Sequence, residues 1–234
     1  MMKQTIRTAF VSSLPVMAGY LVLGFGFGIL LQQAGYSILW AFCMSLTIYA
    51  GAMQYVAVAL LSSGASLLTA ALTTFIVQAR HLFYGISMLT HYRGAGKYKP
   101  YLMFALTDET YSLLCNGKAP NGLPFHRYAF FLSLFNQIYW IAGGVLGATV
   151  GTLVAFNSRG VDFSMTALFI TVFVEQWRST KNHLPAIIGV AVSLVSLLIF
   201  GADRFLIPAM LGIGVMLCLG KGLIEKKEVT GDER

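Results

Sequence analysis

Three of the few charged residues of this chain lie deep inside apolar stretches: Arg80, Asp108 and Glu109. A guanidinium group can bind a carboxylate, and a carboxylate can bind an ammonium group or exchange a proton. Because an isolated charge is very costly in an apolar medium, such residues either pair with one another or face a polar cavity. The adjacent Asp108 and Glu109 point about 100° apart on a helix, so we predict that at least one faces Arg80 or a cavity. The alternative role is a structural ion pair that only fixes helix packing.

A second group of polar residues occurs in the sequence Tyr49-Ala-Gly-Ala-Met-Gln-Tyr55. Its glycine allows a helix to unwind or a ligand to approach the backbone, and its glutamine can both donate and accept hydrogen bonds. Alone this stretch is a weak indication of a ligand site, but together with Arg80 and the two acids it predicts one polar site. The predicted ligand contacts in this stretch are Gly51, Ala52, Gln54 and Tyr55.

The composition identifies the medium that surrounds these residues. Of 234 residues, 57% are hydrophobic and 11% are charged, whereas about a quarter of a typical globular chain is charged. The 16 Lys and Arg residues and 9 Asp and Glu residues are too few to cover a globule of this size in water. Most of them lie between apolar blocks that are long enough to enter lipid, so we predict an all-α polytopic integral membrane protein.

About eight hydrophobic segments are predicted, some of them short or re-entrant. Their limits are 10–31, 36–61, 65–90, 100–115, 126–155, 164–178, 185–201 and 205–220. A full span needs about 20 residues, and irregular backbone at membrane depth needs protein or a water-filled cavity around it. Short or broken segments are therefore candidate positions for a binding site. We predict a single transmembrane transporter domain over residues 1–220 and a short polar cytoplasmic tail over residues 221–234.

The placement of the net charge of +7 indicates a topology. If the N-terminus is inside and every segment crosses, the basic loop 91–99 lies outside, against the positive-inside rule. The conflict disappears if one of the first three segments stops halfway and segment 100–115 is re-entrant, because 91–99 and 116–127 then both lie inside. We therefore predict about six crossings, two incomplete segments and both termini in the cytoplasm. Glu175, near a segment end and beside Arg178, is interpreted as an interfacial residue.

Glycine recurs in two of the long segments. The residues are Gly24, Gly26 and Gly28 in segment 10–31 and Gly143, Gly147 and Gly151 in segment 126–155. Stripes of small residues let two transmembrane helices approach closely, and we interpret both groups as packing surfaces. The first group lacks the spacing and the preceding strand of a nucleotide-binding fingerprint.

Other functional classes lack their sequence signatures here. The chain has no Walker motif, which favours secondary transport, and no HExxH or GxSxG motif, so we predict no enzymatic activity and no catalytic residue. The widely spaced Cys43, Cys115 and Cys218 predict no metal, cofactor or disulfide. No basic run is interleaved with aromatic residues, so we predict no nucleic-acid partner. An ion channel or ion carrier, and a non-transporting membrane scaffold subunit, are the alternative functions.

Three motifs resemble those of a known family. They are Tyr49-Ala-Gly-Ala-Met-Gln-Tyr55, Ala79-Arg-His-Leu-Phe-Tyr-Gly85 and Leu106-Thr-Asp-Glu-Thr-Tyr111. In order and separation they are similar to the motifs of the AzlC family, the large subunit of branched-chain amino acid exporters. The resemblance is strongest up to Tyr111, with little beyond Ala167-Leu-Phe169 in the second half. It implies secondary-active export of valine, leucine, isoleucine and methionine across the inner membrane, together with a small AzlD-like membrane subunit.

The residues suit the chemistry that this resemblance implies. In lipid, the carboxylate and the ammonium group of an amino acid must both be satisfied, while burial of a valine or leucine side chain gains only about 1.5–3 kcal/mol. Arg80, or the free amides of a helix broken near Gly51, could hold the carboxylate. Asp108 or Glu109 could hold the ammonium group, and both acids are candidates for proton coupling. The residues predicted to wall the side-chain pocket are Tyr55, Phe83 and Tyr84.

Overall fold

The computed structural model describes residues 2–153, 170, 173–174, 177–178, 183–201, 205, 208–209, 211–217 and 219–220. These residues form helices and connecting turns, without a strand among them, so the all-α prediction is confirmed for the described part of the chain. They belong to two compact units, Met1–Thr166 and Ala167–Arg234. Glu175, the stretch 167–169, Cys218 and the tail 221–234 lie outside the described residues.

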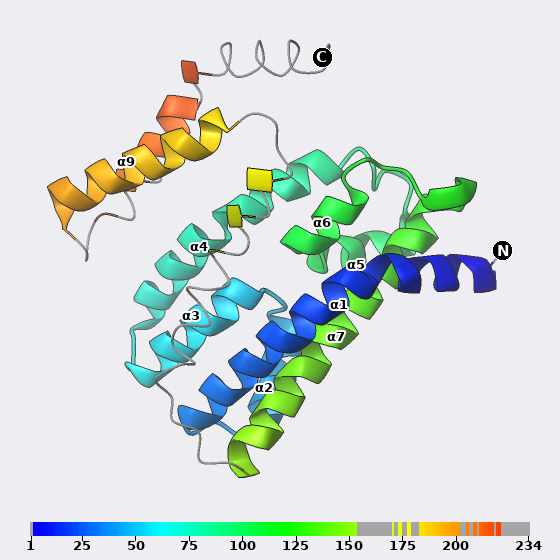
Figure 1. Ribbon diagram of the computed structural model, residues 1–234, viewed down its shortest axis with the longest axis horizontal. Helices are drawn as coiled ribbons and strands as arrows, with labels where there is room; N and C mark the ends of the chain where they lie inside the picture. The colour runs from blue at the N-terminus through cyan, green and yellow to red at the C-terminus, as the bar shows by residue number, and fades with distance from the viewer. Residues whose placement is uncertain are drawn as a thin grey trace. The chain divides into compact units, whose positions relative to one another are not determined.

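The first unit contains most of the described helices (Figure 1). In chain order they are α1 Met2–Gln33, α2 Ile38–Thr47, α3 Gly51–Ser62, α4 Leu67–Met88, η1 Gly96–Tyr98, α5 Lys99–Phe104, α6 Asp108–Leu114, η2 Pro120–Gly122 and α7 Phe125–Leu153. The second unit contains α9, Leu184–Phe200. Among the described helices, α1 and α7 are long and apolar enough to cross a membrane, while α2, α3 and α9 are shorter apolar helices.

The predicted segments correspond to these helices in different ways. Segments 10–31, 65–90, 126–155 and 185–201 are each one helix, although α1 begins earlier than predicted, at Met2. Segments 36–61 and 100–115 are each broken into two helices. Most of segment 164–178 and parts of segment 205–220 lie outside the described residues, so the count of about eight segments stays a prediction.

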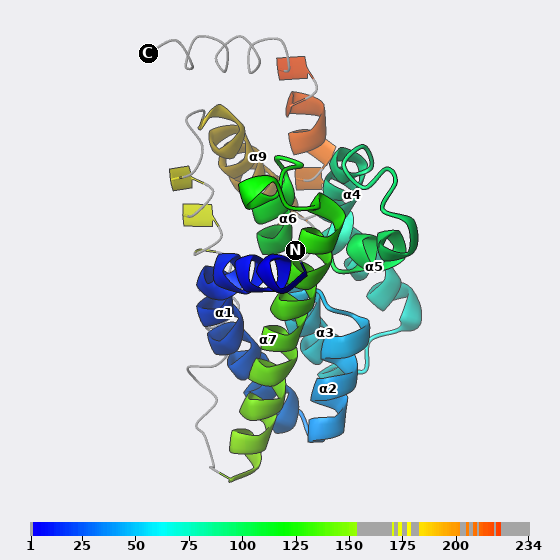
Figure 2. The same cartoon turned by 90° about the vertical axis from the view of Figure 1, so that its right-hand side faces the viewer.

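Helices α1 and α7 pack side by side and run in the same direction (Figure 1, Figure 2). A Cβ atom added to Gly24 would lie 3.2 Å from Gly143 Cα, and one added to Gly28 would lie 2.9 Å from the carbonyl carbon of Gly147. The paired residue numbers rise together, which establishes the parallel direction. Gly24 and Gly28 of the first group and the whole of the second group therefore lie in the contact of this helix pair, as the sequence predicts.

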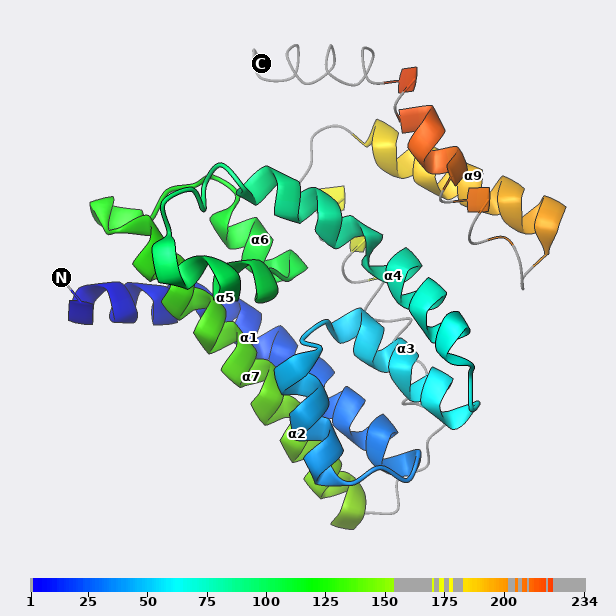
Figure 3. The same cartoon turned by 180° about the vertical axis from the view of Figure 1, so that it is seen from behind.

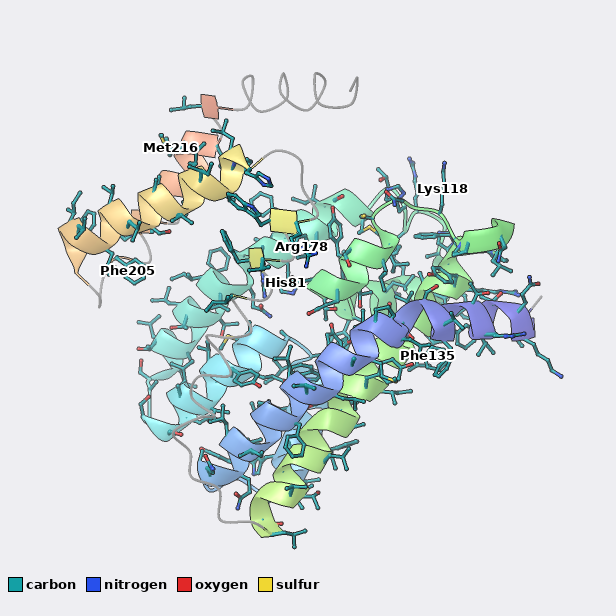
Figure 4. All side chains as sticks on the ribbon, in the orientation of Figure 1. His81, Lys118, Phe135, Arg178, Phe205 and Met216 are labelled. Atoms are coloured by element: carbon teal, nitrogen blue, oxygen red, sulfur yellow. The ribbon has the colours of Figure 1, made fainter. Side chains whose placement is uncertain are left out.

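Helix α1 bends within its N-terminal half, as Figure 1 shows. Pro15 lies inside the helix, where it cannot donate a backbone hydrogen bond, and a proline at such a position kinks a helix. Before the bend, the Phe10 ring meets the Phe135 ring edge-on at a centroid distance of 5.5 Å (Figure 4). The Ser13 hydroxyl lies 3.1 Å from the Tyr139 hydroxyl. Both parts of α1 thus stay in contact with α7.

Helices α2 and α3 form a hairpin that starts and ends at the C-terminal end of α1 (Figure 3). The two helices are joined at Tyr49, whose φ of 39° is rare for a residue with a side chain. The end of α3 returns to the end of α1, where the two helices line a cavity of about 370 Å³. The residues around this cavity are Leu30, Gln33, Ala34, Tyr55, Val58, Ala59 and Ser62. Segment 36–61 therefore turns back instead of continuing through the helix layer.

Helices α5 and α6 form a second hairpin, from the opposite end. They are separated by Ala105-Leu106-Thr107, and the Thr107 hydroxyl caps α6 by accepting a hydrogen bond from the backbone N–H of Thr110. After α6, Gly117 packs against the ring of His91, which precedes α5 in the chain. Nε2 of His126 lies 3.1 Å from the carbonyl oxygen of His91. The loops before and after this hairpin therefore lie together.

Helix α4 connects the two hairpins and runs opposite to α1 and α7. It begins shortly after α3, near the end of α1, and it ends before Tyr92, whose ring stacks on Phe125 of α7 at 6.3 Å. Two hairpins with α4 between them place loops 91–99 and 116–127 at one end of the unit. This is the arrangement that the loop charges require, with 36–61 as the early segment that stops halfway. The number of crossings and the side of the termini stay predictions.

We expect cysteines placed at Lys97 and at Lys118 to be labelled from the same side of the membrane, and a cysteine at Ser63 from the other side. All three residues are exposed, and Figure 4 shows Lys118 on the loop between α6 and α7. The measurement is modification by a membrane-impermeant maleimide in intact cells, in a background without the native cysteines. Labelling of the Lys97→Cys variant from the periplasmic side would contradict the topology.

Candidate functional site

The tips of the two hairpins meet beside α1. The rings of Tyr49, at the α2–α3 tip, and Phe104, at the end of α5, have centroids 6.2 Å apart. From α1, the Tyr20 hydroxyl lies 2.7 Å from Thr107 Oγ1 and also 2.7 Å from Glu109 Oε2, within hydrogen-bond distance of both. Helix α3 begins beside one tip and α6 beside the other, so irregular backbone from both hairpins gathers at one place.

A chain of buried polar groups continues from Tyr20 to α7. The Thr107 hydroxyl donates to Thr110 Oγ1 at 3.0 Å, and Nδ2 of Asn136 donates to the same oxygen at 3.0 Å. The Tyr49 hydroxyl is buried beside Tyr20 and Thr110 and interacts with both. We call this group the tip cluster; its members are Tyr20, Tyr49, Thr107, Glu109, Thr110 and Asn136.

Arg80 of α4 pairs with Asp108, the first residue of α6. Arg80 Nη1 lies 2.6 Å from Asp108 Oδ2, and the two side chains are 32% and 15% exposed. The pair makes a single contact, because among the described residues Nε of Arg80 and Oδ1 of Asp108 are both buried without a hydrogen-bond partner. One unpaired donor and one unpaired acceptor therefore belong to the same ion pair.

The adjacent acids face different partners. Asp108 faces Arg80, whereas Glu109 faces Tyr20, as the angle of about 100° between successive helical residues requires. Of the two predicted surroundings, Arg80 or a cavity, the structure places Asp108 against Arg80. In the described part of the chain Glu109 forms no ion pair with a cation, so the two acids can take different roles.

The predicted contacts in the stretch 49–55 also hold α3 in place. Gly51 packs against the ring of Trp140, where a Cβ atom would lie 2.9 Å from Cη2. Oε1 of Gln54 accepts a hydrogen bond from Nε1 of Trp140 at 2.6 Å, and the Tyr55 hydroxyl donates to the carbonyl oxygen of Leu23 at 2.6 Å. The glycine is thus explained by the indole ring that covers it. A close approach of ligand is not needed to account for it.

The start of α3 nevertheless keeps unpaired donors. Ala50 provides no side-chain cap, so the first N–H groups of the helix, including those of Gly51 and Ala52, have no partner within it. Within the described parts of the chain, Nε2 of Gln54 is buried and unpaired as well. The structure thus shows the helix break near Gly51, while the binding role of its amides stays a prediction.

Of the two predicted aromatic walls on α4, the structure brings one toward the ion pair. Tyr84 stacks on Tyr111 of α6 at a centroid distance of 4.6 Å and interacts electrostatically with Asp108 and Arg80. Phe83 is 72% exposed on the outer face of α4, so the structure does not bring it to the tip cluster or the ion pair. His81, labelled on α4 in Figure 4, meets Tyr84 edge-on.

Several residues of the site were not predicted from the sequence. Thr107 carried a usable signal, because a threonine directly before two acids is typical of a helix start. Tyr20, Trp140 and Asn136 carried none, since each is a single polar or aromatic residue within a long apolar helix. Their partners are more than twenty positions away in the chain, so only the packing of the helices identifies them.

The site lies within the part of the chain that matches a known family. The family model described as "AzlC protein" matches residues 15–154, which is more than half of the chain and includes both hairpins, the ion pair and the tip cluster. The chain belongs to the AzlC family. In the described part of this AzlC family member, no group of three or more His, Cys, Asp or Glu residues could hold a metal ion.

Relatives of the chain are similar over most of its length. It is 44% identical to the branched-chain amino acid transport protein AzlC of Bacillus subtilis (strain 168), over 96% of this chain and 88% of that protein. It is 40% identical to an uncharacterized membrane protein of Haemophilus influenzae, over 96% and 92%. It is 29% identical to the inner membrane protein YgaZ of Escherichia coli (strain K12), over 87% and 84%. No solved structure matches the chain.

Proposed function

We propose that the chain is the large subunit of a secondary-active exporter of branched-chain and related hydrophobic amino acids. The substrates are valine, leucine, isoleucine and methionine, and the membrane is the inner membrane. The name of the Bacillus relative supports the substrate class, and the name of the Escherichia coli relative supports the location. The observation that carries the proposal is the ion pair of Arg80 and Asp108, with its one unpaired donor and one unpaired acceptor.

The ion pair matches the head group of an amino acid. A zwitterion presents a carboxylate and an ammonium group on one carbon, so it needs a donor and an acceptor close together. Nε of Arg80 donates to the carboxylate and Oδ1 of Asp108 accepts from the ammonium group, while the existing contact between the side chains stays in place. A buried polar group without a hydrogen bond costs about 1–3 kcal/mol, and a substrate that binds both Nε of Arg80 and Oδ1 of Asp108 removes this cost for each of the two atoms.

The apolar part of the substrate needs little further recognition. Tyr84 would wall the pocket beside the ion pair, and Tyr55 would line the route toward the cavity at the end of α1 and α3. That cavity, about 370 Å³, has the volume of a small-molecule site. The free amides at Gly51 and Ala52, with the amide of Gln54, are a second set of donors that could receive the carboxylate along this route. Phe83 is left out of this pocket because its side chain is exposed.

Export requires an energy source, which we propose is a proton gradient. Asp108 is engaged by Arg80, whereas Glu109 is bound to a neutral phenol, so Glu109 is the better of the two candidates for the exchanged proton. A small AzlD-like membrane subunit completes the exporter, and both termini lie in the cytoplasm.

We expect purified chain, reconstituted into liposomes together with its small membrane partner, to show leucine counterflow. Unlabelled leucine on the far side should accelerate entry of labelled leucine, because a carrier returns faster when it is loaded. Unlabelled valine should do the same, whereas lysine should not, because its charged side chain cannot enter an apolar pocket.

The same assay distinguishes the alternatives. An ion channel shows no acceleration by substrate on the far side. A scaffold subunit shows no leucine entry with or without the partner. Either result would overturn the proposed function, and the Arg93→Gln variant, in an exposed loop, serves as the control for the loss of one positive charge.

A further inference from the structure

The tip cluster contains three consecutive contacts between oxygen atoms. The first joins Glu109 Oε2 to the Tyr20 hydroxyl at 2.7 Å, the second joins Tyr20 to Thr107 Oγ1 at 2.7 Å, and the third joins Thr107 to Thr110 Oγ1 at 3.0 Å. Each distance requires one hydrogen between the two oxygens. Tyr20, Thr107 and Thr110 are all buried, so water does not replace a missing hydrogen bond.

The number of available hydrogens decides the protonation state that fits this geometry. Tyr20 and Thr107 carry one hydroxyl hydrogen each, and the hydrogen of Thr107 is directed to Thr110. With Glu109 ionised, Tyr20 donates to Glu109, and the contact of Tyr20 with Thr107 has a hydrogen only if Thr110 donates to Thr107 and Thr107 to Tyr20, which reverses the direction from Thr107 to Thr110. With Glu109 protonated, Glu109 donates to Tyr20, Tyr20 donates to Thr107 and Thr107 donates to Thr110. With the observed direction from Thr107 to Thr110, all three contacts carry a hydrogen only when Glu109 is protonated.

We propose that Tyr20 is a positioning residue for the exchanged proton. In this conformation Tyr20 holds the proton on Glu109, and loss of the proton loosens the contact between α1 and α6. The proposal rests on the proposed proton-coupled export. When the proton leaves Glu109 for water, Tyr20 and Thr107 keep their own hydrogens. The hydrogen bond of Tyr20 then turns from Thr107 to the Glu109 carboxylate, and the contact of Tyr20 with Thr107 is lost.

The position of Tyr20 makes this change relevant to transport. Tyr20 belongs to α1, whereas Thr107 and Glu109 belong to the α5–α6 tip that also carries Asp108. A weakened contact between Tyr20 and Thr107 therefore releases the tip that bears one half of the substrate ion pair. Protonation of Glu109 and the geometry of the Arg80–Asp108 pair are therefore linked through the α5–α6 tip, which carries both acids.

The other ionisable groups near Glu109 come from every helix that packs around it. They are Tyr49 at the α2–α3 tip, Arg80, His81 and Tyr84 on α4, Tyr101 on α5, and Asp108 on α6. From α7 the cluster receives Asn136, which does not titrate. Arg80 and Asp108 compensate each other, so the proton on Glu109 changes the net charge at the tips.

The test compares two tyrosine-to-phenylalanine variants. Tyr20→Phe removes the hydroxyl but keeps the ring, which meets Trp140 edge-on at 5.3 Å. Tyr139→Phe is the matched control, because it also removes a buried phenol that bridges α1 and α7, through Ser13, without contact to Glu109. Both variants are reconstituted with the partner subunit, and two rates are measured: leucine transport driven by a pH gradient, and leucine counterflow at equal pH on both sides. The quantity compared is the ratio of the first rate to the second.

We expect this ratio to fall about tenfold in Tyr20→Phe, the effect of one hydrogen bond of about 1.4 kcal/mol, and to stay at the wild-type value in Tyr139→Phe. The pH midpoint of counterflow should also move by about one unit in Tyr20→Phe alone. A structural role would lower both rates equally at every pH. Equal ratios and equal midpoints in the two variants would overturn the proposal.

A second measurement does not depend on transport. Difference infrared spectra of the purified protein across a pH titration should show a carboxylic acid band that disappears in Glu109→Gln and shifts in Tyr20→Phe but not in Tyr139→Phe. If wild-type protein shows no counterflow while the band behaves as expected, the proposed function fails and the positioning role of Tyr20 stands. If counterflow is normal and the band is unchanged in Tyr20→Phe, the positioning role fails and the proposed function stands.

Discussion

The Arg80→Gln variant is expected to lose leucine counterflow altogether. Removal of the guanidinium takes away the donor for the substrate carboxylate and leaves Asp108, which is 15% exposed, without a counter-charge. Removing one partner of a hydrogen-bonded charge pair costs about 2–5 kcal/mol when the pair is buried, and the lower limit, which we expect for this partly exposed pair, already corresponds to about a thirtyfold loss of substrate affinity. The measurement is counterflow over a range of leucine concentrations, with Arg93→Gln as the exposed control.

A more conservative change separates recognition from folding. Arg80→Lys keeps the positive charge for Asp108 but has no counterpart of Nε, so it should fold as stably as wild type and still fail to exchange leucine. The double variant Arg80→Gln/Asp108→Asn should regain stability, because no charge is left unpaired, without regaining transport. Normal counterflow in Arg80→Lys would show that the unpaired Nε atom does not bind the substrate.

Gly28→Ala is expected to prevent correct packing of α1 on α7. A Cβ atom at this position would overlap with the backbone of Gly144 and Ala148, and backbone cannot move aside as a flexible side chain can. Overpacking costs about 1–3 kcal/mol where neighbours can adjust, and we expect a larger loss at a contact between two backbones. The measurement is the thermal stability of the purified protein in detergent, followed by size-exclusion chromatography of heated samples.

The same helix offers a matched control for this prediction. Gly19 of α1 has no atom within 4 Å of the position that a Cβ would take, so Gly19→Ala should leave the protein as stable as wild type or slightly more stable. Gly147→Ala, on the facing side of the contact, should reproduce the defect of Gly28→Ala, because its Cβ would overlap with the backbone of Phe25. Equal stability of the Gly19 and Gly28 variants would show that the close approach of the two helices is not required.

Much of the site was predictable because charge is scarce in this chain. With 11% charged residues, an arginine and two adjacent acids inside apolar segments identify themselves. Their spacing also predicted the contact that the structure shows, since Asp108 and Glu109 diverge on a helix and only one of them faces Arg80. Phe83 was predicted to wall the pocket together with Tyr55 and Tyr84, yet neighbouring helical residues point in different directions and Phe83 lies on the exposed face.

The hairpins show where the sequence alone was insufficient. The loop charges require one early segment to stop halfway, but segments 36–61 and 65–90 are both apolar and similar in length. The break at Tyr49 carries no proline, and its one glycine is also explained by contact with Trp140. The choice of segment 36–61 depends on the packing of α2 and α3 against α1 and α7, which involves residues far apart in the chain.

The sequence by itself determined the all-helical class, the apolar medium, the two glycine surfaces, the family and the residues of the ion pair. These properties follow from composition, periodicity and local motifs, which are all encoded within short stretches of chain. Only the tertiary structure decided which segment turns back, which acid pairs with Arg80, and that Tyr20 joins Glu109 to Thr107. Such contacts depend on how helices from distant parts of the chain pack, and a hydrogen bond that links residues nearly ninety positions apart leaves no local pattern.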